Sequence, residues 1–147
     1  MSLLSIFDTS GSALSAQTVR LNTTASNLAN AESVSSNTSE TYRARHPIFA
    51  ARLASALGDA GPNGVDTDRE ATQGVDVVGV MQSQAPLSMR YEPDHPLADK
   101  NGYVAYPNVN VVQEMADMIS ATRSFQLNVE VMNSARTLAE RVLAMGQ

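Results

Sequence analysis

The chain of 147 residues is acidic, with a net charge of −5 at pH 7 and a pI near 4.8, and it contains no cysteine. The charge argues against a nucleic-acid-binding surface, which needs clustered Lys and Arg, and the lack of cysteine excludes disulfides and thiolate metal sites. Charged residues make up only 17% of the chain and aromatic residues 5%, whereas about 25% of residues in a typical soluble domain are charged. We therefore expect a modest core that depends on extended helix contacts or on partner molecules.

Glycine and proline divide the sequence into three parts. Both residue types are absent from residues 12–46 and 111–145, and they cluster between Gly58 and Asn110. Uninterrupted ends around a broken centre predict a helix, a β-rich module and a second helix. We therefore expect a mainly α fold with a small β-rich insert. Residues 1–34 and 108–147 would form a terminal-helix domain, packed as an antiparallel coiled-coil-like pair, and residues 35–107 a middle module.

The start of the chain resembles neither a membrane span nor a signal peptide. The segment Met1–Asp8 lacks a basic region and a cleavage site. Nowhere does an apolar run approach the roughly 18 residues that a transmembrane helix requires. If the protein leaves the cytoplasm, we expect another route to carry it.

The first predicted helix has a repeating stripe of apolar and small residues. Its members are Leu4, Phe7, Gly11, Leu14, Thr18, Leu21, Ala25 and Leu28. Steps of three and four place them on one face, where leucines interdigitate with a partner helix and small residues allow its close approach. Thr18 would lie on this face and Thr23 away from it. An ordinary helical hairpin core remains an alternative explanation of the stripe.

Charge is almost absent from the other faces of the same helix. Arg20 is the one charged residue between Thr9 and Ala31. Because surfaces buried against other proteins lose charged residues, we interpret these faces as contacts between subunits. A flexible, weakly helical tail is the alternative, since Ser, Thr and Asn are poor helix formers.

The middle of the chain has the residue types of strands and turns. Tyr42–His46 is expected to be extended, and Pro47–Leu57 to form a short helix that ends at Gly58. Val75–Val80 and Leu87–Tyr91 are predicted to be short strands. Residues 59–74 are predicted to form a mobile, Gly-rich loop.

The last predicted helix begins after Asn110, a suitable N-cap, and ends at Gly146. A stripe with steps of three or four runs along it through Val111, Met115, Met118, Thr122, Phe125, Val129, Met132, Ala135, Leu138, Val142 and Met145. The charged residues, among them Glu114 and Asp117, lie off this stripe. We expect Met118, Phe125, Val129, Met132 and Leu138 to form the helix seam together with Leu14, Leu21 and Leu28.

No residue pattern indicates chemistry. His46 and His95 are far apart in sequence, and neither has a second ligand at metal-binding spacing. Asp94 and His95 are adjacent, but no activated nucleophile accompanies them. We therefore expect no catalytic site, metal, cofactor or small-molecule substrate.

Two motifs carry a resemblance to a known family. Thr24–Asn30 resembles the N-terminal motif of the rod, hook and hook-associated proteins of the bacterial flagellum, through Ser26, Asn27, Leu28, Ala29 and Asn30. His95–Asp99, Gly102–Val104 and Pro107–Asn110, the last with Pro107, Asn108 and Asn110, resemble the proximal rod subunits. Phe125 and Leu127 depart from that family, which usually has a tyrosine and a small residue there.

The resemblance implies a structural subunit of the proximal rod in the bacterial flagellar basal body. Such subunits are exported unfolded by the flagellar type III apparatus and polymerise in the periplasmic space through their terminal helices, forming the tube that transmits motor torque. The implied partners are copies of the same chain, other rod proteins, the export-gate adaptor and the distal rod. A rod subunit of another position and a helical adaptor or chaperone-like binding module remain alternatives, and only the adaptor would fold autonomously as a monomer.

Overall fold

A computed structural model of the chain describes residues 3–35, 37–52 and 74–145. Its elements, in order, are α1 (Leu3–Ala29), β1 (Arg45–Ala51), β2 (Val75–Gln82), β3 (Ser88–Tyr91), β4 (Tyr103–Tyr106) and α2 (Val111–Met145). This confirms the expected mainly α fold with a small β-rich insert between terminal helices. Neither of the two helices described is long and apolar enough to cross a membrane.

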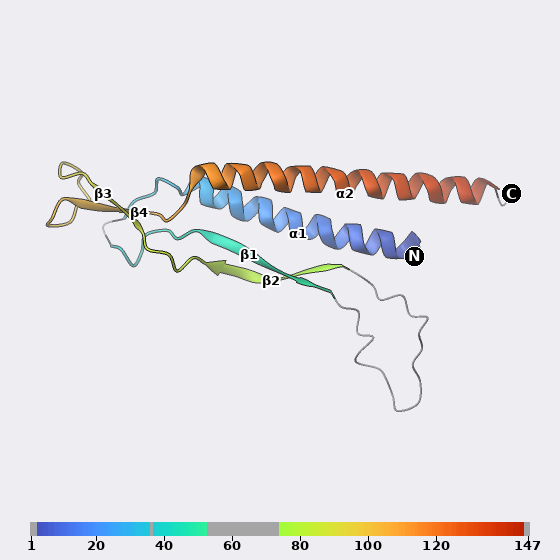
Figure 1. Cartoon of the computed structure of the whole chain (residues 1–147), viewed down its shortest axis with the longest axis horizontal. Helices are drawn as coiled ribbons and strands as arrows, with labels where there is room; N and C mark the ends of the chain where they lie inside the picture. The colour runs from blue at the N-terminus through green and yellow to red at the C-terminus, as the bar shows by residue number, and fades with distance from the viewer. Residues whose placement is uncertain (1–2, 36, 53–73, 146–147) are drawn as a thin grey trace, which may run out of the picture.

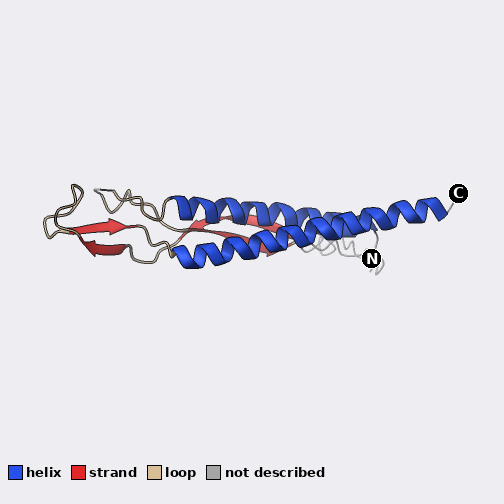
Figure 2. Cartoon of the chain, turned by 90° about the horizontal axis from the view of Figure 1, so that it is seen from above, coloured by secondary structure: helices blue, strands red, loops and turns tan. Residues whose placement is uncertain are grey.

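The two helices run side by side in opposite directions along the long axis of the molecule (Figures 1 and 2). Helix α1 has 27 residues and α2 has 35, which corresponds to about 40 and 50 Å at 1.5 Å per residue. Because the start of α2 lies beside the end of α1, the longer helix extends past the N-terminus of its partner (Figure 1). The antiparallel pair confirms the prediction.

Helix α1 lies between α2 and an antiparallel pair formed by β1 and β2 (Figure 1). Both strands contact α1, and neither contacts α2. Val75 and Val77 of β2 are half-buried while Asp76 and Val78 are exposed, the alternation expected of a strand with one covered face. At the start of β2, the backbone N–H of Val75 donates to Ser12 Oγ of α1 over 3.1 Å.

This second layer corrects the interpretation of the uncharged faces of α1. Thr23, expected away from the helix contact, is only 8% exposed, and its hydroxyl donates to the Val19 carbonyl over 2.7 Å. Thr18, expected on the contact face, is exposed. The stripe was wrong at these positions because α1 packs on two elements, so its covered surface is wider than one seam. Part of the charge depletion therefore reflects packing within the chain.

The described part of the insert contains four strands, of which the sequence predicted two. The strands expected at Val75–Val80 and Leu87–Tyr91 are confirmed as β2 and β3. The helix expected from Pro47 is wrong as far as Ala51, because Ile48 and Phe49 favour a strand and Pro47 tolerates the open edge of a two-stranded sheet. Strand β4 was not predicted. Residues 53–57 of that expected helix and residues 59–73 of the loop expected at 59–74 lie outside the described residues.

Strands β3 and β4 form a second antiparallel hairpin at the end of the molecule opposite the chain termini (Figure 1). Its turn is closed by Asp99, whose Oδ1 accepts the backbone N–H groups of Asn101 and Tyr103 over 2.7 and 2.9 Å. Gly102 has φ of +79°, and a Cβ there would lie 2.9 Å from the Tyr91 ring. Glycine is therefore required both for the backbone conformation and for the close approach of Tyr91.

Candidate assembly site

The predicted seam residues are only partly brought together. Half-buried positions at or beside the contact between α1 and α2 are Leu14, Leu21, Leu28, Met118, Phe125 and Met132. Val129 is 36% exposed and Leu138 is 55% exposed, so this chain leaves both uncovered. Along α2 the row with the greatest burial is instead Glu114, Ala121 and Ala135, with Met118, Phe125 and Met132 interspersed.

The buried residues of α1, which packs on both α2 and the β1–β2 pair, are small or polar. Ser10, Ala16, Thr23, Thr24 and Asn27 are all buried. The sequence prediction followed the largest apolar side chains, but the most buried positions of the two helices are mainly alanines and short polar residues, which allow close approach of a neighbouring element. Glu114 and Ala121 are seven residues apart and Ala121 and Ala135 fourteen. This heptad spacing was the available signal, and the charge of Glu114 concealed it.

Asn27 of the N-terminal family motif is the centre of a polar cluster and is completely buried. Its Nδ2 donates to the Arg45 carbonyl over 2.8 Å and to Glu114 Oε1 over 2.9 Å. Its Oδ1 accepts the Arg45 N–H and the Tyr42 hydroxyl, both over 2.9 Å. The side-chain amide of Asn27 thus links α1, on which it lies, to the segment that enters β1 and to the first turn of α2.

Asn108 of the second family motif connects the same parts of the chain. Its Oδ1 accepts the Ala44 N–H over 2.8 Å, and its Nδ2 donates to the Ala85 carbonyl over 2.9 Å. We call Asn27, Tyr42, Arg45, Asn108 and Glu114 the polar joint. The polar joint fixes the exit of α1, the start of β1 and the entry to α2 relative to one another.

The other family-motif residues shape the helix ends. Asn110 Oδ1 accepts the N–H groups of Val112 and Gln113 over 3.1 and 3.2 Å, which confirms the predicted N-cap of α2. Asn30 Nδ2 donates to the Ser26 carbonyl over 2.8 Å in the last turn of α1. Pro107 is buried just before α2, whereas Ala29 is exposed.

The one charged residue in the central part of α1 also has its partner within the chain. Arg20 Nη2 lies 2.7 Å from Asp117 Oδ1 of α2, and both side chains are about 30% exposed, at 29% and 31%. This ion pair crosses the helix contact between the polar joint and the middle of the helices. Its partial exposure limits its worth to about 1 kcal/mol or less, so it favours register more than stability.

Glu114 is the one acidic residue buried in the helix contact as the structure describes it, with 4% of its surface exposed. Burial raises the pKa of its carboxyl above the usual 4.5, and the repulsion of Asp117 acts in the same direction. The hydrogen bond from Asn27 and the charge of His46 oppose this rise in pKa. Burial therefore destabilises the charged form of Glu114, and the hydrogen bond from Asn27 offsets part of that destabilisation.

Replacing Glu114 with glutamine is expected to flatten the pH dependence of stability. Because the folded pKa is raised, the folded chain binds a proton more tightly than the unfolded chain, so this group favours folding below pH 4.5. That contribution is lost as pH rises through the folded pKa. Glutamine keeps an oxygen for Asn27 and carries no charge, so its melting temperature at pH 7 should equal or exceed that of wild type.

Thermal melts between pH 4 and 8 measure this difference, with Glu130→Gln as the control at an exposed position on the same helix. A Glu114→Gln chain whose stability keeps the full wild-type pH dependence over that range would contradict the assignment.

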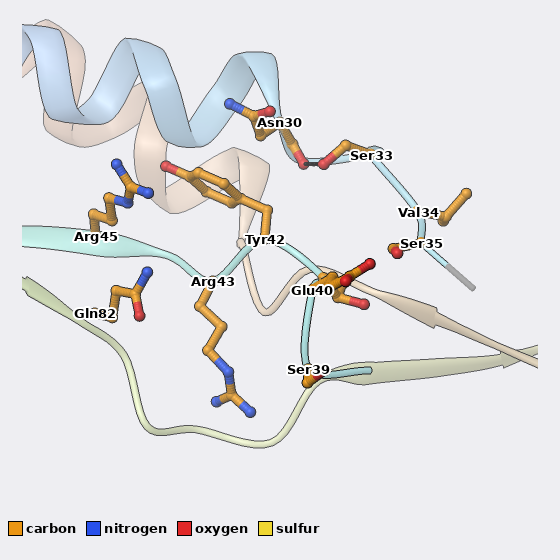
Figure 3. Close-up of a pocket in the computed structure, with 11 residues that line it drawn as sticks. Asn30, Ser33, Val34, Ser35, Ser39, Glu40, Tyr42, Arg43, Arg45 and Gln82 are labelled. Atoms are coloured by element: carbon orange, nitrogen blue, oxygen red, sulfur yellow. Dashed lines mark hydrogen bonds between the residues drawn. The ribbon is translucent and has the colours of Figure 1, made fainter. Parts of the chain in front are cut away.

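A polar pocket of about 460 Å³ lies where the chain leaves α1 and approaches β1 (Figure 3). Figure 3 shows Tyr42 directed toward the last turn of α1, with Arg43 and Arg45 following it along the chain. Arg45 stacks over the Tyr42 ring at 5.3 Å, and Arg43 donates to the Ser83 and Ala85 carbonyls. Both arginine side chains are therefore used in contacts within the chain. We interpret the pocket as part of the packing around the polar joint and not as a ligand site.

An apolar groove of about 400 Å³ opens between the first turns of α1 and the second half of α2. It is lined by Ile6, Leu127, Val131, Ala135 and Leu138, with Glu130 and Ser134 at its edge. Leu127 is 62% exposed and Val131 47%. Apolar side chains of α2 this exposed beside a helix contact indicate a surface that another molecule covers.

Among the described residues, no group of three His, Asp or Glu side chains could hold a metal ion. His46 lies at the start of β1 and His95 in the β3–β4 turn, where its Nδ1 accepts the Leu97 N–H over 3.1 Å. The main features of the described residues are thus the polar joint and the apolar surface of α2 that the chain itself leaves uncovered.

Comparisons with known proteins agree with this geometry. Residues 7–35 match the model of flagella basal body rod proteins, and residues 100–145 match that of the C-terminal region of the flagellar basal body rod FlgEFG proteins. Flagellar basal-body rod protein FlgC of Salmonella typhimurium is 48% identical over 147 residues, with 100% of both chains covered. FlgC of Escherichia coli O6:H1 is also 48% identical over all of both chains. FlgC of Borreliella burgdorferi is 36% identical over 152 residues, which cover 100% of this chain and 99% of the relative.

Proposed function

From the premise that this chain belongs to the FlgC family of flagellar basal-body rod proteins, and is a structural component of that rod, we propose that it polymerises through its two terminal helices in the proximal rod. The resulting tube would transmit the torque of the motor. One observation carries this proposal: α2 keeps large apolar residues exposed beside the helix contact, as at Leu127 and Val131. Neighbouring subunits would cover them.

The polar joint supports a role in transmitting force. It joins α1, β1 and α2 through the buried amide of Asn27. Torsion applied to one helix therefore passes to the other and to the insert through directional hydrogen bonds, which resist shear better than apolar contact alone. We expect the subunit to be most rigid where α1 ends and α2 begins, because these hydrogen bonds lie there.

The domain organisation follows the same division. Residues 1–34 and 108–147 would line the tube, and residues 35–107 would form a middle module outside it. The packing of β1 and β2 on the side of α1 that faces away from α2 supports this arrangement, because it leaves α2 free for contacts around the tube. In this arrangement Leu14, Leu21, Leu28, Met118, Phe125 and Met132 close the helix pair, and Val129 and Leu138 contact neighbouring subunits.

Export of the unfolded chain by the flagellar type III apparatus and assembly in the periplasmic space belong to this proposal. The absence of cysteine supports it, because no disulfide can lock the fold before export. The partners would be further copies, other rod proteins, the export-gate adaptor and the distal rod. The relatives are named as flagellar basal-body rod proteins, and we propose no catalytic role for His46 or His95.

Order in the free chain is expected to decrease along α2. Buried contacts gather near the polar joint, whereas the last turns of α2 have Leu138, Val142 and Met145 exposed at 55%, 62% and 87%. Helical turns without tertiary contacts are marginal in water, so amides of residues 136–145 should exchange roughly 100-fold faster than those of residues 117–125. Hydrogen exchange of the purified chain at micromolar concentration measures this gradient.

Uniform protection from residue 114 to residue 145 in the free chain would contradict the proposal. It would show that the helix pair is complete without neighbours, as the helical adaptor alternative requires. Circular dichroism provides an independent check, because a frayed α2 lowers the helix content below the 27 and 35 residues of the two helices.

A further inference from the structure

The connection between β3 and β4 contains two neighbouring residues that can react with each other. Asn101 is followed directly by Gly102, and Asn101 is exposed. The backbone N–H of Asn101 donates to Asp99 Oδ1 over 2.7 Å, but its side chain has no hydrogen-bond partner among the described residues. The side-chain amide of Asn101 is thus left unengaged next to the peptide nitrogen of Gly102.

The reaction open to such a pair is the formation of a succinimide. The nitrogen of Gly102 loses its proton and bonds to Cγ of Asn101, the bond between Cγ and Nδ2 breaks, and ammonia leaves. Water then opens the imide ring at one of its two carbonyl carbons, which gives aspartate or isoaspartate in place of Asn101. One water is consumed and one ammonia is released, so the reaction needs no oxidant, metal or second protein. Glycine favours the attack because it has no side chain to hinder it.

The fold requires glycine at the second position of this pair. Gly102 has φ of +79°, and a Cβ there would lie 2.9 Å from the Tyr91 ring and 3.3 Å from Pro93. Any other residue would be strained and would clash with these neighbours. Asparagine is in turn a preferred residue of turns. The conformation of the turn therefore selects a reactive pair of residues.

Hydrogen bonds hold the reacting peptide group in the folded turn. The Gly102 N–H donates to the Asp99 carbonyl over 3.0 Å, and the Gly102 carbonyl accepts the Glu92 N–H over 2.9 Å. Asp99 Oδ1 accepts the N–H groups of Asn101 and Tyr103 over 2.7 and 2.9 Å. Attack requires the Gly102 nitrogen to lose its proton and to move toward Cγ of Asn101. The first of these bonds occupies that proton, and the others fix the peptide groups on either side.

We propose that Asn101 is a site of deamidation and isoaspartate formation, which the turn built on Asp99 keeps unreactive in the folded chain. Asp99 is a positioning residue, since it takes no part in the bond changes and acts by fixing the turn. Neither helix and neither strand of the β1–β2 pair packs against β3 or β4. The turn can therefore open while the rest of the fold persists, and the rate of reaction follows the fraction of open turn.

Isoaspartate would damage the hairpin permanently. Its main chain runs through the former side-chain carbon, which adds one methylene group between residues 101 and 102. The two N–H groups that now share Asp99 Oδ1 would no longer be spaced to reach it together, and the pairing of Tyr91 with Tyr103 beside the turn would be displaced. The turn thus protects the hairpin against a reaction of its own sequence.

Incubation of the purified chain at neutral pH, followed by peptide mapping, measures this reaction. Mass spectrometry detects deamidation, and enzymatic methylation of the freed α-carboxyl detects isoaspartate. The native chain should react at Asn101 more slowly than the same chain in guanidinium chloride, by roughly tenfold or more. The other Asn-Gly pair, Asn63–Gly64, lies outside the described residues and in a different tryptic peptide, so the two sites are measured separately.

Asp99→Ala removes the side-chain acceptor and should raise the native rate at Asn101 roughly tenfold. Asp99→Asn is the matched control, because it keeps an oxygen for both N–H groups without the charge and should retain wild-type protection. Equal native rates of Asp99→Ala and wild type, or loss of protection in Asp99→Asn, would overturn the proposal. If Asp99→Ala does not fold, the wild-type chain decides: equal native and denatured rates, or no reaction at Asn101 in denaturant, refute the site.

Discussion

The Asn27→Ala chain is expected to lose most of its stability and to leave cells without motility. Asn27 is fully buried and makes four hydrogen bonds, two through Nδ2 and two through Oδ1. Alanine would leave the Arg45 amide groups and the Glu114 carboxylate buried without this partner. Unsatisfied buried groups cost about 1–3 kcal/mol each, so we expect a total loss of roughly 3–5 kcal/mol, a large part of the 5–15 kcal/mol typical of a domain.

Denaturant unfolding of the purified chain measures the loss, and swimming in a strain that lacks the native protein measures its consequence. Asn22→Ala is the matched control, because Asn22 is an exposed asparagine of the same helix, and it should change stability by less than about 0.5 kcal/mol. Equal stability of the two variants would show that Asn27 does not organise the fold.

The second large effect is expected from Val131→Asp, which should block rod assembly while leaving the chain folded. Val131 lines the apolar groove and is 47% exposed in the free chain, so a carboxylate there stays solvated until a neighbour covers it. A charge buried without a partner at an interface costs several kcal/mol. Motility should therefore be lost although the melting temperature changes little.

Gln126→Asp is the control for Val131→Asp, since Gln126 is an exposed polar residue of α2 that does not line the groove. It introduces the same charge on the same helix and should support swimming. Normal swimming of the Val131→Asp strain would exclude the groove as a contact between subunits.

Much of the fold followed from the sequence because its strongest signals are local. Long segments without glycine or proline gave the helices, and Asn110 gave the start of α2, since an N-cap depends on residues only two and three positions away. Strand β1 was mistaken for a helix because its pairing with β2, at the far end of residues 53–73, decides its conformation. The secondary-structure preferences of residues 47–51 alone could not predict a pairing with a strand so distant in sequence.

The candidate site was harder to predict because its key residues contradict simple burial rules. Glu114 was placed away from the helix contact because charged side chains are rarely buried. Its burial depends on Asn27, which comes from the other end of the chain. The family motif identified Asn27 and Asn108, but only the structure brings both to Tyr42–Arg45 and explains their role in the polar joint. Similarly, Thr23 is covered because α1 packs on two elements.

Chemical accessibility of a single cysteine at Val131 tests the central claim most directly, because the natural chain has none. In the Val131→Cys chain, the thiol should react readily with a maleimide in the free protein and at least tenfold more slowly in purified basal bodies. Val78→Cys is the reference, since Val78 is 68% exposed on the insert that we place outside the tube, and it should react in both states. Equal reactivity of Val131→Cys in the free chain and in basal bodies would contradict assembly through the helix faces.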